Sequence, residues 1–150
     1  MCAIVGSCNK DTLKKLIELN SKRGSFSYSF SVLDKDYNIT YNVKEFGEFD
    51  KSLLDIEYEN SLYYIAHIQA PTGGLLKDYN RIHPASIDNV HIWHNGILKN
   101  YYIKALQDKF DTDISWDTKL LLMNVNELED IDGTFSCLLL KEGNGMSLFR

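Results

Sequence analysis

The sequence lacks any run of about 18 apolar residues, the length that a membrane-spanning helix needs. Its first residues carry neither the basic region nor the long apolar core of a signal peptide. No stripe of lysine and arginine with interleaved aromatic residues is present, and a net charge of −5 argues against a nucleic-acid partner. We therefore expect a cytoplasmic protein that engages neither a membrane nor a nucleic acid.

Cysteine is also scarce. The three cysteines (Cys2, Cys8 and Cys137) are odd in number and show no metal-ligand spacing, which favours reduced thiols in the cytosol. We expect no metal and no cofactor. What is present is ordinary for a globular chain: 44% apolar and 25% charged residues over 150 positions, without linker or repeat. This composition predicts a single domain over residues 1–150.

Hydrophobic periodicity predicts an α+β chain with largely antiparallel sheets. "RGSFSYSFSVLD" alternates aromatic or apolar residues with serines, which predicts a strand with one buried face. Asp11 is expected to cap the first helix, and the strand "NVHIW" is expected to break at "HNG". A loop is expected from "APTGG" to about residue 86. We expect strands over 3–5, 25–32, 39–43, 61–69, 89–93, 133–141 and 146–150, and helices over 11–20, 98–110 and 117–128.

The second residue has a chemical consequence if the initiator methionine is removed. Cys2 would then carry a thiol and a free α-amine on the same carbon. An α-amine has a pKa of about 7.7–8.0 and a thiol one of about 8.5, so the amine can take the thiol proton. The alternative is that Cys2 is a small apolar residue at the start of a buried strand.

Several separated stretches resemble one family. "MCAIVG", the pair Arg23–Gly24, "HIQAPTGG", "HPASIDNVHIWHNGILKNY", "WDTKLLL" and "IDGTFSCLLL" are similar, in order and spacing, to motifs of class II glutamine amidotransferases. These are glutaminases with an N-terminal cysteine nucleophile. The resemblance covers nearly the whole chain, and it implies the αββα sandwich of N-terminal-nucleophile (Ntn) hydrolases in a minimal version.

The resemblance also implies roles for particular residues. Cys2 would attack the side-chain amide of glutamine, and its own amine would act as the base. Framework roles fall to three histidines, His67, His83 and His94. Asn95 and Gly96 would form the oxyanion site, and Asp117 would pair with the α-ammonium of glutamine. Thr72 and Gly74 would shape a loop around the α-carboxylate, and Arg23 would lie near the nucleophile. From the residues alone, "HNG" also fits a turn and Asp117 a helix N-cap.

Two departures from the family pattern stand out. Ala3 replaces the usual glycine, which places a Cβ near the substrate. Gln69 replaces the arginine that in relatives holds the α-carboxylate, and a neutral amide is the weaker partner. Lys77 or Arg81 could supply the missing charge.

The sequence thus predicts a glutaminase that forms a γ-glutamyl thioester on Cys2. The ammonia would pass to a separate acceptor chain, a synthetase or transferase. One alternative is an Ntn hydrolase that acts on another γ-glutamyl or amide substrate, which Gln69 favours. The other is a catalytically inactive copy of the domain that only binds a ligand or partner.

Overall fold

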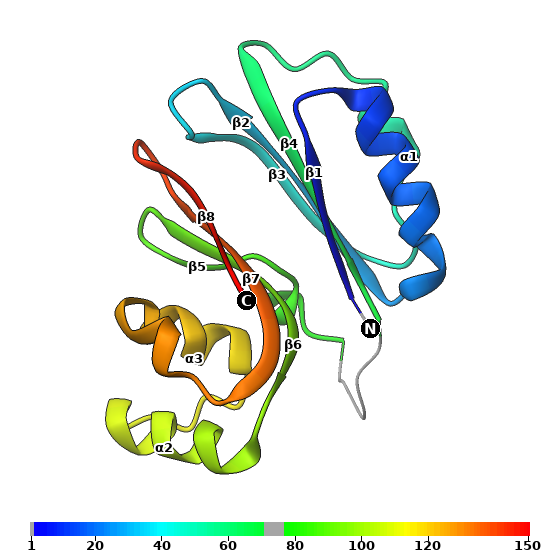
Figure 1. Cartoon of the computed structure of the whole chain (residues 1–150). Coiled ribbons are helices and arrows are strands. Elements are labelled where there is room, and N and C mark those ends of the chain that lie inside the picture. Colours follow the sequence, from blue (N-terminus) through cyan, green and yellow to red (C-terminus); the bar gives the residue numbers. More distant parts are fainter. Residues whose placement is uncertain (1, 71–76) are drawn as a thin grey trace.

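Two antiparallel four-stranded sheets lie face to face, and helices cover the outer face of each (Figure 1). The structure, a computed structural model, describes residues 2–70 and 77–150. The first sheet has the order β1 (Ala3–Ser7), β4 (Ser61–Gln69), β2 (Ser27–Asp34) and β3 (Ile39–Phe46). The second has the order β5 (Ala85–Ile87), β6 (Val90–Leu98), β7 (Gly133–Lys141) and β8 (Gly145–Phe149). Helix α1 (Lys10–Asn20) packs on the first sheet, and α2 (Asn100–Phe110) and α3 (Asp117–Met123) pack on the second. The predicted αββα sandwich is confirmed.

Helix α1 begins one residue earlier than expected, because its cap is Asn9 rather than Asp11. The side-chain oxygen of Asn9 accepts a hydrogen bond from the backbone N–H of Thr12 at 2.9 Å. An amide in this position satisfies one of the free N–H groups of the first turn. The predicted apolar face holds, since Leu13 and Ile17 are buried against the first sheet.

Strand β2 is buried on both faces, so the expectation of one buried face was wrong. Tyr28 and Phe30 belong to the core beneath α1, as the alternation predicted. The serines on the other face are also fully buried (Ser27, Ser29 and Ser31). Hydroxyl groups tolerate this position where they find partners, as Ser31 does with Asn42 at 2.8 Å. The second sheet covers a face that the sequence pattern assigned to solvent.

Strand β6 does not break at "HNG" but continues to Leu98 and pairs with β7 along its whole length. Gly96 makes this possible. Its φ is +156°, and a Cβ there would lie 2.4 Å from Cα of Phe135. Only glycine allows the two strands to approach so closely. As a result α2 begins at Asn100 instead of near residue 98.

Helix α3 ends at Met123, five residues before the expected end. The backbone N–H of Asn124 bonds to the carbonyls of Leu120 and Leu121, and a 3₁₀ segment over Val125–Asp130 follows. The side-chain oxygen of Asn124 accepts from Lys109 at 2.7 Å. This buried amide, held by α2, stops the regular helix where periodicity alone would continue it.

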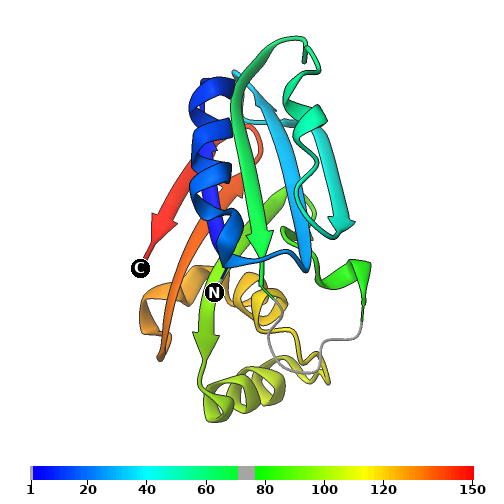
Figure 2. The same cartoon turned by 90° about the vertical axis from the view of Figure 1, so that its right-hand side faces the viewer.

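A small apolar cluster separates the two sheets and sets how they face each other. Leu33 and Ile65 come from the first sheet, and Trp93 and Leu140 from the second; all four are fully buried. At one end of this layer β1 lies against β6 of the opposite sheet, close to α3 (Figure 2). Cys2 precedes β1 at this end. Within the described residues, no helix is long and apolar enough to cross a membrane.

Candidate active site

A pocket of about 570 Å³ opens where the two sheets and α3 meet. Besides Arg81, His83 and His94, four of the residues predicted from the sequence line it. They are Cys2 before β1, Gln69 at the end of β4, Gly96 on β6 and Asp117 at the start of α3. Residues far apart in the chain therefore come together around one cavity, as a catalytic site requires.

The Cys2 thiol is half-buried in this pocket. Burial raises the pKa of the thiol, the backbone N–H of Ala70 lowers it in part, and the carboxylate of Asp117 raises it. A thiol with a raised pKa is mostly protonated at neutral pH, and the thiolate is the nucleophile. Chemistry at Cys2 therefore needs a base close to the sulfur.

Asp117 faces the pocket from the first turn of α3, but it is not the helix cap. Trp116 occupies the cap position, and the Asp117 carboxylate accepts from the backbone N–H of Thr118 at 2.8 Å. Its second oxygen lies 3.7 Å from Nδ1 of His94. Burial lowers the pKa of His94, although the Asp117 carboxylate opposes this shift, so the imidazole is neutral at pH 7. Asp117 thus keeps a net negative charge for a ligand.

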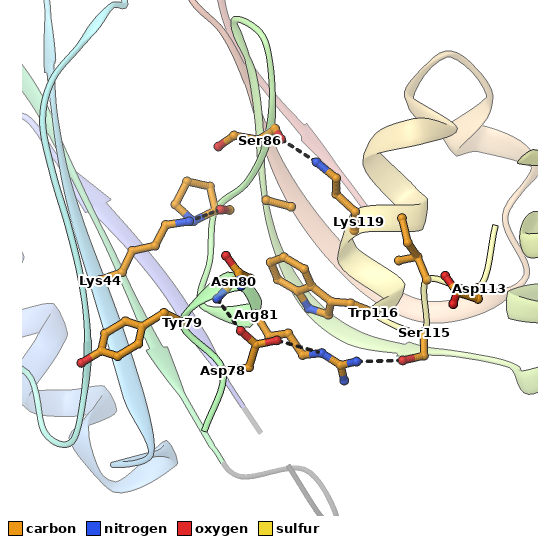
Figure 3. Close-up of a pocket in the computed structure, with 13 residues that line it drawn as sticks. Lys44, Asp78, Tyr79, Asn80, Arg81, Ser86, Asp113, Ser115, Trp116 and Lys119 are labelled. Carbon is orange, nitrogen blue, oxygen red and sulfur yellow. Dashed lines mark hydrogen bonds and ion pairs between the residues drawn. The ribbon is translucent and has the colours of Figure 1, made fainter. Parts of the chain in front are cut away.

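Gln69 and Arg81 line the same pocket. The side-chain oxygen of Gln69 accepts from the Ser27 hydroxyl at 2.7 Å, which leaves the amide N–H groups to serve as donors. Arg81 lies in the 3₁₀ turn Tyr79–Arg81; it donates to Ser115 at 2.8 Å and its Nε lies 3.8 Å from Asp78 (Figure 3). Lys77, the other candidate for the missing charge, lies over the ring of Phe46 at 5.7 Å and does not line the pocket.

Three buried histidines form a neutral wall behind the pocket. The hydroxyl of Thr118 lies 3.0 Å from Nε2 of His83 and 3.2 Å from Nδ1 of His94. The rings of His67 and His83 are 4.0 Å apart. Burial lowers the pKa of His67 to about 3 and holds the pKa of His83 well below its usual range. Both ring nitrogens of His67, Nδ1 of His83 and Nε2 of His94 are buried without a hydrogen-bond partner among the described residues, so the hydrogen-bonding framework expected of these histidines stays a prediction. Thr118, which joins two of them, belongs to the motif "WDTKLLL", but the sequence analysis gave it no role of its own.

Other predicted residues lie apart from this pocket. Asn95 lines a smaller cavity of about 210 Å³ between the sheets, together with Gly6 and Ser136. Arg23 is exposed in the 3₁₀ turn Ser21–Arg23. The next residue, Gly24, packs so closely on the backbone of Gln69 that a Cβ would lie 2.4 Å from its carbonyl carbon. Thr72 and Gly74 lie outside the described residues.

The described residues contain no group of three or more His, Cys, Asp or Glu side chains arranged to hold a metal ion. Among the described residues that line the pocket, Arg81 is the only one with a fixed positive charge and Asp117 the only carboxylate. The site thus combines a thiol, one anion and one cation. This set suits a zwitterionic ligand that carries a group for the thiol to attack.

Comparison with solved structures supports the fold. No protein-family model and no curated protein matches the sequence. One similar structure is a glutamine phosphoribosylpyrophosphate amidotransferase from B. subtilis complexed with ADP and GMP, with 19% identity and a TM-score of 0.61 over 93% of this chain. A second, described as the allosteric regulatory enzyme of purine biosynthesis, has 17% identity and a TM-score of 0.59, also over 93%.

This chain spans about a third of the length of those two structures, 34% and 35%. At such low identity the likeness shows the fold alone. That fold is the Ntn-type sandwich that the motifs predicted.

Proposed function

We propose that this protein is a class II glutamine amidotransferase domain that hydrolyses glutamine at Cys2 and supplies ammonia to a separate acceptor enzyme. One observation carries the proposal: a thiol, a carboxylate and a guanidinium group (Cys2, Asp117 and Arg81) line a single pocket. Glutamine offers a matching set of groups, namely a side-chain amide, an α-ammonium and an α-carboxylate. The fold supports the proposal, since a similar structure is that of a glutamine amidotransferase.

The reaction follows from the groups present. With Met1 removed, the α-amine of Cys2 takes the thiol proton, and the sulfur attacks the amide carbon. The C–N bond then breaks, the ammonium form of the amine returns the proton to the leaving nitrogen, and ammonia and a γ-glutamyl thioester result. Water attacks the thioester, with the same amine as base, and glutamate leaves. The proposed donors to the oxyanion in both steps are the Gly96 N–H, which lines the pocket, and the Asn95 amide, which would have to turn out of the smaller cavity between the sheets to reach it.

A direct test is to assay the purified protein for ammonia and glutamate release from glutamine. An electrophilic glutamine analogue should label Cys2 and spare the other thiols. Cys8 is exposed but lies outside the pocket, and burial raises the pKa of Cys137 to about 12. Labelling of all three cysteines to the same extent, without hydrolysis, would favour the inactive copy of the domain.

We expect Arg81→Met to raise KM for glutamine by about tenfold to hundredfold with little change in kcat, because a hydrogen-bonded charged partner of the α-carboxylate is lost. Lys77→Met is the matched control, since Lys77 is also positively charged and lies four residues from Arg81 in the chain but does not line the pocket. Steady-state kinetics of both variants measure the difference. Unchanged KM in Arg81→Met would favour the second candidate, an Ntn hydrolase whose amide substrate lacks a free α-carboxylate, as Gln69 in place of arginine suggests.

We expect Asn95→Ala to lower kcat by about a hundredfold, the usual effect of losing one oxyanion donor. Ser136→Ala is the control, because Ser136 pairs with Asn95 across the β6–β7 ladder and lines the same small cavity. Substrate affinity should be nearly the same in the two variants. An equal effect of both substitutions on kcat would assign Asn95 to packing between the sheets and leave Gly96 as the only oxyanion donor of the pair.

A further inference from the structure

A second pocket, of about 650 Å³, lies beside the candidate active site on the far side of Arg81. Three cationic side chains line it: Lys44 from β3, Arg81 from the 3₁₀ turn and Lys119 from α3 (Figure 3). Two carboxylates line it as well. Asp78 lies 3.8 Å from Nε of Arg81, and Asp113 is exposed. Lys44 and Lys119 are therefore the two cations of this pocket that have no acidic partner among the described residues.

Within the described residues, neither lysine has a carboxylate within 4 Å. The ammonium of Lys44 donates to the carbonyl of Pro84 at 2.6 Å, and that of Lys119 donates to the carbonyl of Ser86 at 2.7 Å. Each ammonium has three donors, so two on each side chain stay available. In Figure 3 the two side chains reach toward the segment that carries Ser86, Lys44 from the left and Lys119 from the right, and the indole of Trp116 lies below them.

The two ammonium groups also act on each other. Burial, and then the charge of Lys119, lower the pKa of Lys44 to about 8. A chain of net charge −5 thus places two ammonium groups on one pocket, where Asp78 is turned to Arg81 and, within the described residues, no carboxylate pairs with either lysine. Such an arrangement is unfavourable unless a negatively charged group completes it.

We propose that this second pocket binds a phosphate monoester, with the phosphate between Lys44 and Lys119 and the organic part against Trp116. A phosphate dianion matches two ammonium groups in charge and accepts several hydrogen bonds from them. The volume lies within the range of small-molecule sites and well exceeds what phosphate alone would fill. A concave cavity of this size favours a small ligand over an acidic segment of a partner protein.

The site is distinct from the proposed glutamine site, although Arg81, Ser115 and Trp116 line both pockets. Neither lysine lines the pocket of Cys2. The ligand would therefore bind next to bound glutamine, on the other side of a shared wall. Binding can be measured directly, without catalysis, so the outcome does not depend on whether the protein hydrolyses glutamine.

The test is calorimetric titration of the whole protein with phenyl phosphate, inorganic phosphate, benzoate and a short polyglutamate peptide. We expect phenyl phosphate to bind most tightly. Lys44→Met and Lys119→Met should each weaken it by about tenfold or more, whereas Lys119→Arg, which keeps the charge, should retain most of the affinity. Lys35→Met is the matched control, because Lys35 is an exposed lysine in the β2–β3 turn outside both pockets. Circular dichroism would confirm that all variants are folded.

Affinity should also fall between pH 7 and pH 9, as Lys44 loses its proton near pH 8. The proposal is overturned if phenyl phosphate fails to bind at millimolar concentration, or if Lys119→Met and Lys35→Met bind it equally well. Inorganic phosphate binding as tightly as phenyl phosphate would refute the role of Trp116 and a monoester ligand. Tighter binding of the peptide would assign the pocket to an acidic partner protein instead.

Discussion

Cys2→Ala is expected to reduce glutamine hydrolysis by about four orders of magnitude or more while leaving the fold intact, since loss of a covalent nucleophile has effects of this size. No other described cysteine can replace it, because neither Cys8 nor Cys137 lines the pocket. Cys2 precedes β1 and is only half-buried, so its removal costs little packing. The measurement is ammonia release with Cys8→Ala as the control, which should retain full activity.

The same mechanism requires that active protein begins at Cys2. Intact mass spectrometry of the purified protein should therefore show loss of the initiator methionine. Full activity in protein that retains Met1, or in Cys2→Ala, would remove the amine-activated thiol from the mechanism. The hydrolytic base and nucleophile would then have to be sought elsewhere in the pocket.

Acid is expected to destabilise the protein steeply below about pH 6.5. An unfolded histidine titrates near 6.5, whereas burial holds the pKa of His67 at about 3 and depresses those of His83 and His94. Below 6.5 the unfolded chain therefore binds protons that the native state does not. Stability is fully present above that pH and is lost as the pH falls. By pH 5 His67 alone should lower the free energy of unfolding by about 2 kcal/mol.

Urea unfolding at several pH values between 5 and 7.5 measures this slope. His67→Gln should remove the part that belongs to His67 and leave a shallower pH dependence. Ser29→Ala is a suitable control, because Ser29 is the partner of His67 in the β2–β4 ladder and its buried hydroxyl does not titrate. If His67→Gln and Ser29→Ala gave the same slope, His67 would be protonated with little cost in the folded protein.

The layered fold was predictable because it depends on the spacing of apolar residues along the chain. The alternation in β2 and the apolar spacing of Leu13 and Ile17 each determine one face of an element. The predictions were wrong where a strand contacts a second sheet or a neighbouring strand in a way that its own sequence does not indicate. Serines 27, 29 and 31 look solvent-exposed until another sheet covers them. "HNG" looks like a turn until a glycine without a Cβ lets β6 continue along β7.

The candidate site was predictable where a residue has distinctive chemistry at a motif position, as Cys2 and Asp117 do. Arg81 entered the sequence analysis only as one of two possible cations, since nothing in "DYNR" shows that a 3₁₀ turn carries its side chain to the pocket of Cys2. Lys44 and Lys119 were not recognised at all. They line one pocket only because the fold brings β3 and α3 to the same place, and no local sequence pattern indicates this.

The apolar cluster between the sheets has a consequence for how this protein can change. Cys2, just before β1, and Gln69 line the pocket from one sheet and Gly96 from the other, so the thickness and tilt of the middle layer set the distance between the proposed nucleophile and the proposed oxyanion donor. Trp93 and its neighbours in that layer act as a spacer of fixed size. Under the proposed mechanism, a change of volume at the spacer would alter the catalytic step although the changed residue makes no contact with the substrate.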